Sequence, residues 1–187
     1  MAADQRRADR AHPFRNRRGG GRGMKPMAWI TAAVLAAGPA LAQDDAFVEF
    51  KVLTPEVARI AAVAAMEHCR AEGYQVGVMV TDRFGTPHVF VRDRFAGAHV
   101  FETAHRKAWT ATSFRTNTTD LARETESGAA TAIRDLDMAL ALGGGLMVLE
   151  GDGSLVAGIG VSGAPSPDLD DVCAEAGIDA IEEFIAF

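Results

Sequence analysis

Residues 75–92 read QVGVMVTDRFGTPHVFVR, and the fold class follows from this stretch. Valines at every second position of Gln75–Thr81 predict a strand, because β-branched side chains with a period of two suit a pleated sheet. The polar, glycine-containing run Asp82–Thr86 predicts a turn. His88–Arg92 then predicts a returning strand, so the whole stretch predicts a β-hairpin.

A second hairpin is predicted closer to the C-terminal end. Leu146–Glu150 and Leu155–Val161 are apolar runs that predict strands. Gly151–Gly153, with an aspartate between two glycines, predicts the turn that joins them. Gly143–Gly145 precedes this hairpin, and the Gly/Pro/Ser-rich stretch Ser162–Pro167 predicts a loop after it.

The remaining segments predict helices. The first opens with Thr54, Pro55 and Glu56, which place a hydroxyl at the N-cap, a proline at the first helical position and an acid in the first turn. The predicted helices cover residues 54–72, 99–115, 117–142 and 169–184, with the third one broken near Gly128.

The predicted order is helix, hairpin, helix or helices, hairpin, helix. The strands come as adjacent antiparallel pairs and do not alternate with helices. We therefore predict an α+β fold, an antiparallel sheet with helices packed on it, and not a doubly wound parallel sheet.

Composition predicts one acidic globular domain behind a basic leader. The 187 residues are 48% hydrophobic and 24% charged, which is typical of a folded domain. Residues 1–42 hold eight Lys/Arg and two Asp, and residues 43–187 hold eleven Lys/Arg and 23 Asp/Glu, so the charge splits into +6 and −12. An acidic domain is repelled by nucleic-acid phosphates, so we expect no nucleic-acid partner.

The leader has the pattern of a secretory signal peptide. Lys25 gives a positive start, Met27–Ala37 is an apolar run, and Ala40–Ala42 is a small-x-small cleavage pattern. The apolar run is shorter than the roughly 20 residues that span a bilayer, so we expect no stable membrane span after cleavage. We predict cleavage between Ala42 and Gln43, which leaves residues 43–187 as one periplasmic or secreted domain.

The role of residues 1–23 is left open by the sequence. They contain two arginine pairs, which are a feature of twin-arginine export signals, but neither pair directly precedes the apolar run. The simpler interpretation is that translation starts at Met24 and that residues 1–23 are an upstream extension.

The chain has two cysteines, Cys69 and Cys173, both in segments that predict helices. Two cysteines in an exported protein form a disulfide when the fold brings them together. The sequence does not say whether these two approach each other, and it contains no C-x-x-C or zinc-type spacing.

Several motifs, taken in order, resemble one known family. They are Val80–Gly85, similar to V-V-D-x-x-G; Ala104–Ala111, similar to A-x-x-K-A-x-T-A; Gly143–Leu146, similar to G-G-G-L; Gly158–Ala164, similar to G-x-I-G-V-S-G-A; and the acids Asp170 and Asp171 at the start of the last helix. Together they resemble the GlcG/HbpS-like family of haem-binding or haem-processing proteins, which is also related to a domain attached to some corrinoid adenosyltransferases. The resemblance covers roughly residues 54–184.

The resemblance implies a profilin-like α+β fold, homo-oligomers, and small ligands such as haem bound near subunit surfaces. This chain departs from the family pattern at two loops. Arg92–Ala98 is longer than the family's R-M-D-G-A and carries an additional arginine, and Met147 stands where the family often has proline. Because both loops are expected to shape a ligand site, the identity of the ligand stays open.

One helical face offers a candidate haem site. Haem needs an apolar slot, cations for its propionates and an axial ligand such as histidine. Phe101, His105 and Trp109 lie at i, i+4 and i+8 and form one stripe, so His105 is the predicted iron ligand between two aromatic rings. Arg106 and Lys107 beside it are predicted to pair with carboxylates. The alternative is that the aromatic residues pack on another surface and His105 is simply solvated.

Two further histidines are candidate ligands. His99 follows an Ala-Gly-Ala segment and is either a mobile ligand or a helix cap. His68 lies on the apolar stripe of the first helix, where the alternative is a structural histidine that interacts with the helix dipole. His88 is predicted to be exposed on the first hairpin.

Lys107 is a weak candidate for catalysis, so the sequence leaves open whether the protein is an enzyme. Its neighbours Ala104, Ala108 and Ala111 are small, and a lysine in such surroundings can act as a base or Schiff-base former. The alternative is a lysine that extends to solvent or pairs with a carboxylate. The pattern Gly158-x-Gly160-x-x-Gly163 lacks the context of a dinucleotide site and predicts close packing and a turn.

Three functions are compatible with these features. The first is an exported haem- or tetrapyrrole-binding protein with a scavenging or sensing role. The second is an enzyme or accessory protein that acts on a small carboxylate or alcohol, through Lys107, Arg92, Arg94 and the glycine-rich turn. The third is an assembly protein without a ligand, whose alanine-rich helices make subunit contacts.

Overall fold

The computed structural model describes residues 47–187, so the predicted signal peptide, the start at Met24 and the cleavage after Ala42 lie outside the described residues. The described residues all belong to one compact unit. Within the described part of the chain, no helix is both long and apolar enough to cross a bilayer.

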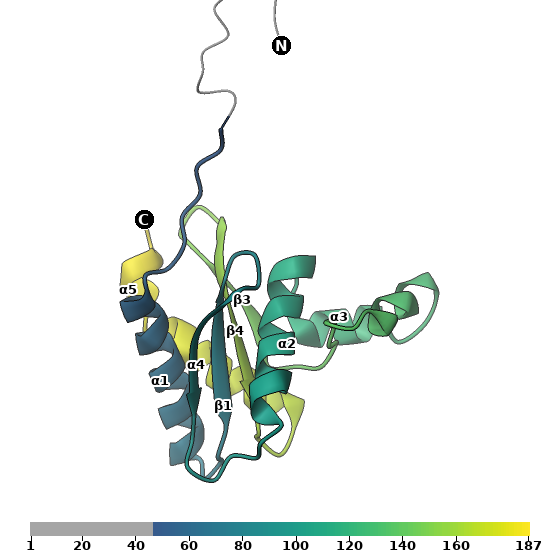
Figure 1. Cartoon of the computed structure of the whole chain (residues 1–187), viewed down its shortest axis with the longest axis horizontal. Coiled ribbons are helices and arrows are strands. Elements are labelled where there is room, and N and C mark those ends of the chain that lie inside the picture. The colour runs from purple at the N-terminus through teal and green to yellow at the C-terminus, as the bar shows by residue number, and fades with distance from the viewer. Residues whose placement is uncertain (1–46) are drawn as a thin grey trace, which may run out of the picture. The chain divides into compact units, whose positions relative to one another are not determined.

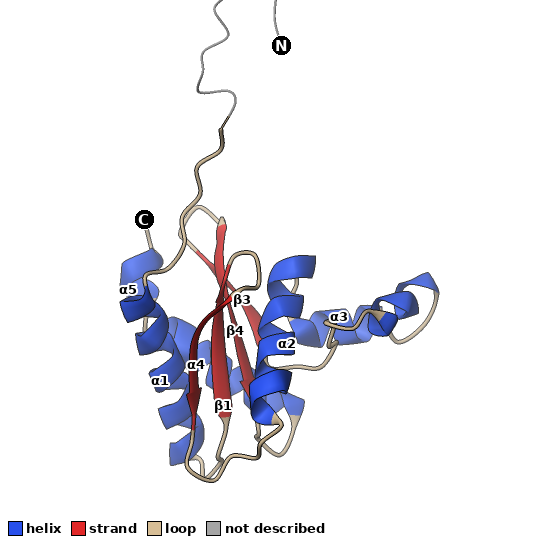
Figure 2. Cartoon of the chain, in the orientation of Figure 1, coloured by secondary structure: helices blue, strands red, loops and turns tan. Residues whose placement is uncertain are grey.

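Four antiparallel strands form a single sheet in the order β2-β1-β4-β3 (Figure 2). The strands are β1 (Gly77–Asp82), β2 (Pro87–Arg92), β3 (Gly145–Leu149) and β4 (Leu155–Ser162). Both predicted hairpins are confirmed. They join through β1 and β4, where Gly77 pairs with Ser162 at one end and Asp82 pairs with Ala157 near the other.

Helices cover both faces of the sheet (Figure 1). Helices α1 (Pro55–Ala71) and α4 (Pro167–Asp179) pack together on one face, followed by the short α5 (Glu182–Ile185). Helix α2 (Val100–Phe114) lies on the opposite face, against β1, β3 and β4. The predicted α+β class, an antiparallel sheet with helices packed on it, is confirmed.

The start of α1 follows from its local sequence. The Thr54 hydroxyl accepts a hydrogen bond from the backbone N–H of Val57 at 3.4 Å, and Pro55 occupies the first helical turn. The small residues Ala58, Ala61 and Ala65 are buried on the side that faces the sheet and α4. These are the features that predicted the helix from the sequence.

Helix α2 lies unusually close to the sheet because glycines face it. A Cβ atom added to Gly160 of β4 would overlap the backbone carbonyl of Ala104. One added to Gly158 would lie 2.6 Å from the Thr112 side chain and 2.8 Å from the Ala108 carbonyl oxygen. The predicted role of these glycines, close backbone packing, is therefore confirmed.

Cys69 of α1 and Cys173 of α4 form a disulfide, which answers the question that the sequence left open. Both cysteines are buried within the same core cluster. One helical turn away, a Cβ atom on Gly177 would lie 2.7 Å from the Ala61 carbonyl oxygen, so the two helices cross in close contact. The covalent bond thus joins α1 to α4 through two cysteines that are 104 positions apart in the sequence.

The prediction of one long, broken helix over residues 117–142 is correct over Thr118–Glu124 and wrong after this segment. The structure has α3 (Thr118–Glu124) and a 3-10 helix, η2 (Ala129–Asp135), and no helix in residues 136–142. Helix α3 ends at Thr125, whose hydroxyl donates to the Leu121 carbonyl oxygen at 2.7 Å. Such a side-chain bond competes with continuation of the helix, and Gly128 adds a positive φ of 78°. The predicted last helix, 169–184, is likewise two helices, α4 and α5.

Candidate functional site

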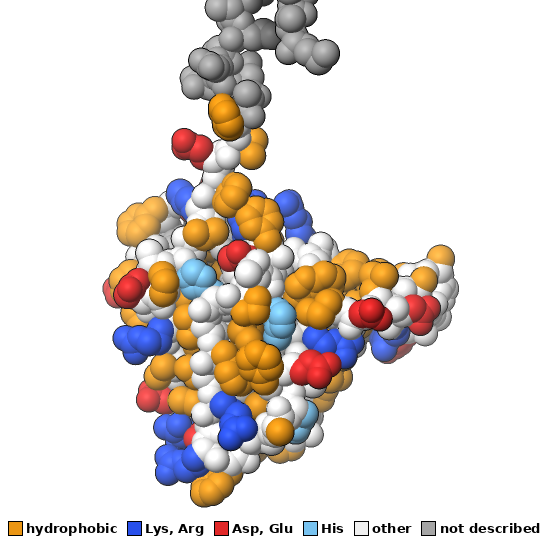
Figure 3. Space-filling view, in the orientation of Figure 1, with side chains coloured by type: hydrophobic (Ala, Val, Ile, Leu, Met, Phe, Trp, Pro, Cys, Tyr) orange, Lys and Arg blue, Asp and Glu red, His pale blue; other side chains and the backbone are white. Residues whose placement is uncertain are grey.

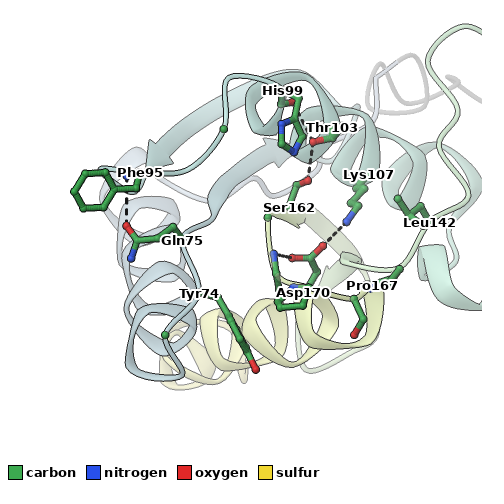
Figure 4. A pocket seen from close by; sticks show the side chains of 16 residues that line it. Tyr74, Gln75, Phe95, His99, Thr103, Lys107, Leu142, Ser162, Pro167 and Asp170 are labelled. Carbon is green, nitrogen blue, oxygen red and sulfur yellow. Dashed lines mark hydrogen bonds and ion pairs between the residues drawn. The ribbon is translucent and has the colours of Figure 1, made fainter.

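A cavity of about 580 Å³ lies where β4 ends, between the starts of α2 and α4 (Figure 4). Its floor carries Thr103, Lys107, Ser162 and Asp170, and His99 stands at its side. The remaining lining residues are Gly73, Tyr74, Gln75, Phe95, Gly97, Leu142, Gly163, Ala164, Pro165, Ser166 and Pro167. The cavity therefore combines a polar floor with a partly apolar rim.

A buried ion pair forms the floor. The Nζ of Lys107 donates to Asp170 Oδ2 at 2.7 Å and to the Val161 carbonyl oxygen at 2.9 Å. The side chains of Lys107 and Asp170 are only 1% and 5% exposed. An ammonium group has three protons, so one of them has no acceptor among the described residues after these two bonds.

Asp170 also fixes the loop at the end of β4. Its Oδ1 accepts a hydrogen bond from the backbone N–H of Ala164 at 3.0 Å. Burial raises the pKa of this carboxyl, while the charge of Lys107 and the hydrogen bonds from Lys107 and Ala164 act in the opposite direction. The carboxylate thus links α2, the loop after β4 and α4 at one point.

This pairing bears on the two predicted roles of Lys107. The sequence offered a base or Schiff-base former, or a lysine paired with a carboxylate. A Schiff base requires a neutral amine that can reach its substrate, whereas the Lys107 ammonium donates to two acceptors and is almost fully buried. The geometry favours a lysine that organises the floor and donates a hydrogen bond.

Two hydroxyls continue the polar floor toward the rim. The Thr103 hydroxyl lies 2.7 Å from the Ser162 hydroxyl and 3.1 Å from the His99 carbonyl oxygen. Ser162 is the last residue of β4 and Thr103 lies in the first turn of α2. Neither residue was among the predicted site residues, because their proximity depends on how α2 packs on the sheet.

His99 is the one candidate histidine that borders this cavity. It sits at the N-cap position of α2, but its side chain makes no capping hydrogen bond, so the predicted alternative of a helix cap is not realised by the ring. The ring packs against Gly97, where a Cβ atom would lie 2.7 Å from His99 Nδ1. Among the described residues, the imidazole has no hydrogen-bond partner, and it is exposed.

The loop that carries His99 is anchored by a buried carboxylate. Asp93 accepts two hydrogen bonds from the Arg70 guanidinium, at 2.8 Å and 3.1 Å, and one from the backbone N–H of Arg94 at 2.7 Å. The Asp93 side chain is 1% exposed. The bond from Arg70 is the main reason why the pKa of Asp93 lies below its usual range.

The predicted stripe Phe101, His105 and Trp109 does share one face of α2, but it does not line this cavity. The His105 Nε2 lies 3.3 Å from the Gly85 carbonyl oxygen, within hydrogen-bond distance. A Cβ atom on Gly85 would lie 2.5 Å from the Trp109 ring. The Phe101 ring meets Phe90 edge to face with centroids 4.9 Å apart. The stripe therefore packs on the first hairpin, which favours the packing role.

The other predicted site residues lie apart from the cavity as well. His68 is half-buried in the last turn of α1, and His88 is exposed on β2 as predicted. The Arg106 guanidinium donates to the Ala139 carbonyl oxygen at 2.9 Å, which holds the segment that follows η2. In residues 47–187, no group of three His, Cys, Asp or Glu side chains is arranged to hold a metal ion directly.

Comparison with known proteins decides the family. Residues 53–179 match the family described as "Haem degrading protein HbpS-like". The chain belongs to this HbpS-like family. The resemblance predicted from the motifs is therefore confirmed over most of the folded domain.

Solved structures agree with this assignment. Streptomyces reticuli HbpS, solved as a double mutant, is 40% identical with a TM-score of 0.70, over 78% of this chain and 98% of that chain. A PduOC:heme complex is 29% identical with a TM-score of 0.63, over 70% and 95% of the two chains. Klebsiella pneumoniae protein ORFY, 21% identical with a TM-score of 0.68 over 72% and 93%, shares the fold. A comparison with curated proteins gave no significant match.

The buried ion pair generates a first prediction. Asp170→Ala removes the partner of a buried ammonium, so we expect the free energy of unfolding to fall by about 3–5 kcal/mol. The double variant Lys107→Met/Asp170→Ala removes both charges, and we expect it to recover much of that loss. Urea denaturation of the three proteins measures both effects, and a double variant no more stable than Asp170→Ala would contradict the prediction.

The loop anchor generates a prediction about pH. The pKa of Asp93 is lower in the folded state than in the unfolded state, where it is about 3.9. The ionised carboxylate therefore stabilises the fold fully at pH values above the unfolded pKa. This stabilisation is lost as the pH falls through the pKa of the folded state. We expect Asp93→Asn to lose about 1.5–3 kcal/mol at pH 7. Denaturation curves between pH 7 and pH 3 should show the two proteins converging below about pH 4. A gap that stays constant over this range would show that the Asp93 charge contributes nothing.

Proposed function

We propose that this protein is an exported haem- or tetrapyrrole-binding protein, and that the cavity beside His99 is its binding site. The observation that carries the proposal is the exposed imidazole of His99, without a hydrogen-bond partner among the described residues, at the side of a cavity of about 580 Å³. Neutral imidazole is a common axial ligand of haem iron. Of the candidate histidines, His105 has its Nε2 directed at a carbonyl oxygen and His68 lies outside this cavity.

The residues around the cavity fit a tetrapyrrole. The volume lies within the range of about 300–1,000 Å³ that is usual for small-ligand and cofactor sites. Phe95 and Leu142 at the rim are 81% and 40% exposed, which offers apolar surface to a flat ring. The Ser162 hydroxyl, which accepts from Thr103 and keeps its own proton, and the remaining Lys107 proton are hydrogen-bond donors for carboxylates. When bound, haem would supply the metal, and these residues would hold and orient it.

Relatives support the same ligand. The family is described as haem-degrading, and one structural relative was solved as a complex with heme. Family membership supports haem as the cofactor, as the sequence predicted. The choice of His99 as the axial ligand rests on the geometry of this chain.

The test is an absorbance titration of the purified protein with hemin. We expect a saturable Soret shift at a fixed ratio per subunit. His99→Ala should weaken binding at least tenfold, because the axial bond is lost. His68→Ala and His105→Ala are matched controls that remove an imidazole elsewhere, and we expect them to bind like the parent protein. A shift lost in His105→Ala and kept in His99→Ala would move the site to the stripe on α2.

A second candidate function is binding or turnover of a small carboxylate in the same cavity. It is favoured by the Lys107 ammonium at the floor, which has one proton free for an anion. In this function Lys107 orients the acid, and Asp170 keeps the lysine in place. Saturable binding of a small acid together with a non-saturable response to hemin would favour this function over haem binding.

We also propose that the protein forms homo-oligomers. Phe95 and Phe101 are 81% and 52% exposed, and hydrophobic side chains gather over the first hairpin and α2 (Figure 3). Exposed apolar patches of this kind mark protein contacts. A second subunit over Phe95 would cover the rim of the cavity and bury more of a bound ring.

Export is supported by the disulfide and by the leader. A buried bond between Cys69 and Cys173 is typical of proteins that fold in an oxidising compartment. We expect mass spectrometry of protein recovered outside the cytoplasm to give a chain that starts at Gln43, because cleavage follows Ala42. We also expect that chain to be two hydrogen atoms lighter than its reduced form. A full-length reduced chain confined to the cytoplasm would contradict export.

A further inference from the structure

A second cavity, of about 440 Å³, lies at the opposite end of the sheet from the first. Strand β4 runs from Leu155, which lines this cavity, to Ser162, which lines the first one. The two cavities share no lining residue. The second cavity is therefore separate from the proposed haem site.

The second cavity is lined by apolar side chains together with two arginines. Met147 and Leu149 of β3 and Leu155 at the start of β4 provide the apolar surface. Arg83 of the turn between β1 and β2 and Arg115 at the end of α2 provide two guanidinium groups. Such a combination suits a ligand with an acidic end and an apolar body.

Asp152 is the single acid among the lining residues, and its carboxylate is hydrogen-bonded within the turn between β3 and β4. Its carboxylate accepts a hydrogen bond from the backbone N–H of Ser154 at 2.7 Å, and this bond is the main reason why the pKa of Asp152 is lowered. Asp152 forms no ion pair with either arginine. The two guanidinium charges thus exceed the one carboxylate charge in the cavity.

Both guanidiniums are free of carboxylate partners in the described part of the chain. Arg83 is held instead by aromatic rings, with its Cζ 5.1 Å from the centroid of Phe50 and 5.8 Å from that of Phe84. Stacking on a ring uses the face of a guanidinium and leaves its N–H edge available. A guanidinium whose face contacts aromatic rings can still donate two parallel hydrogen bonds from its edge to a carboxylate.

The same helix fixes the positions of both arginines. The turn that carries Arg83 is seated on α2, because Gly85 packs against the Trp109 ring and lies within hydrogen-bond distance of His105. Arg115 caps the C-terminus of α2, with its N–H donating to the Ala111 carbonyl oxygen. Packing on α2 therefore fixes the backbone positions from which the two arginine side chains extend.

The backbone of Arg115 adds a second indication. Its φ of 52° makes it the one non-glycine residue with a positive φ in residues 47–187. Glycine adopts this conformation at a helix C-terminus without a steric cost. An arginine here carries that cost while presenting its side chain to the cavity.

We propose that this cavity binds a small amphipathic carboxylate. Its acid group pairs with Arg83 and Arg115, and its apolar body lies on Met147, Leu149 and Leu155. The positive charge of the two arginines attracts anions, and the apolar side chains favour those anions that have an apolar body. The site gives the protein a second, anionic ligand in addition to the one proposed for the first cavity.

The experiment is an isothermal titration of the full chain with benzoate, benzyl alcohol and inorganic phosphate as probes. We expect benzoate to bind saturably at one per chain. Arg83→Gln and Arg115→Gly should each weaken benzoate binding at least tenfold. Benzyl alcohol lacks the charge and phosphate lacks the apolar body, so both should bind at least tenfold more weakly than benzoate.

Arg59→Gln is the charge-matched control, because Arg59 is exposed on α1, on the other face of the sheet. We expect it to bind benzoate like the parent protein. Arg115→Gly removes the steric cost of the positive φ, so the melting temperature of this variant should be at least that of the parent protein. A loss of benzoate binding in this variant cannot then be due to unfolding. Any one of three results would overturn the proposal. They are unchanged benzoate binding in both cavity variants, equal binding of phosphate and benzoate, and the absence of saturable benzoate binding.

Discussion

The close contact between α2 and the sheet is the constraint on which the rest of the structure depends. Gly158 and Gly160 of β4 bring no side chain to this contact, so the backbone around Ala104 and Ala108 lies directly on the strand. A contact between two backbones cannot slide or rotate without collision, because interiors are packed at close to crystal density. The position of α2, and with it the face that the helix turns to the sheet, is therefore fixed.

That single helix organises both cavities. Lys107 leaves its buried side toward the end of β4, where Asp170 of α4 meets it and defines the floor of the first cavity. Trp109 and His105 hold the hairpin turn at Gly85, and Arg115 ends the helix beside the second cavity. The predicted stripe and its neighbour Lys107 thus have different roles: Lys107 faces inward to a polar floor, and the stripe residues pack on the hairpin.

Local patterns predicted the fold well, but not the long-range contacts that build the first cavity. Alternating valines specify strands, and Thr54 with Pro55 specifies a helix start, because these preferences act over a few residues. The pairing of Lys107 with Asp170 and the bond between Cys69 and Cys173 span 63 and 104 positions, and no local preference encodes such distances. The helix predicted over residues 117–142 failed because the Thr125 hydroxyl and a positive φ at Gly128 end it early.

The two sides of the first cavity are held in place by different contacts. Its floor is fixed by a buried ion pair and by α4, which the disulfide joins to α1. Its rim, from Asp93 to His99, is fixed mainly by the bonds of Asp93 to Arg70 and Arg94. Length and sequence can change in such a loop without disturbing the core. Because this is also where the chain departs from the family pattern, we expect the rim to determine which ligand the proposed site accepts, and the floor to anchor the carboxylates of that ligand.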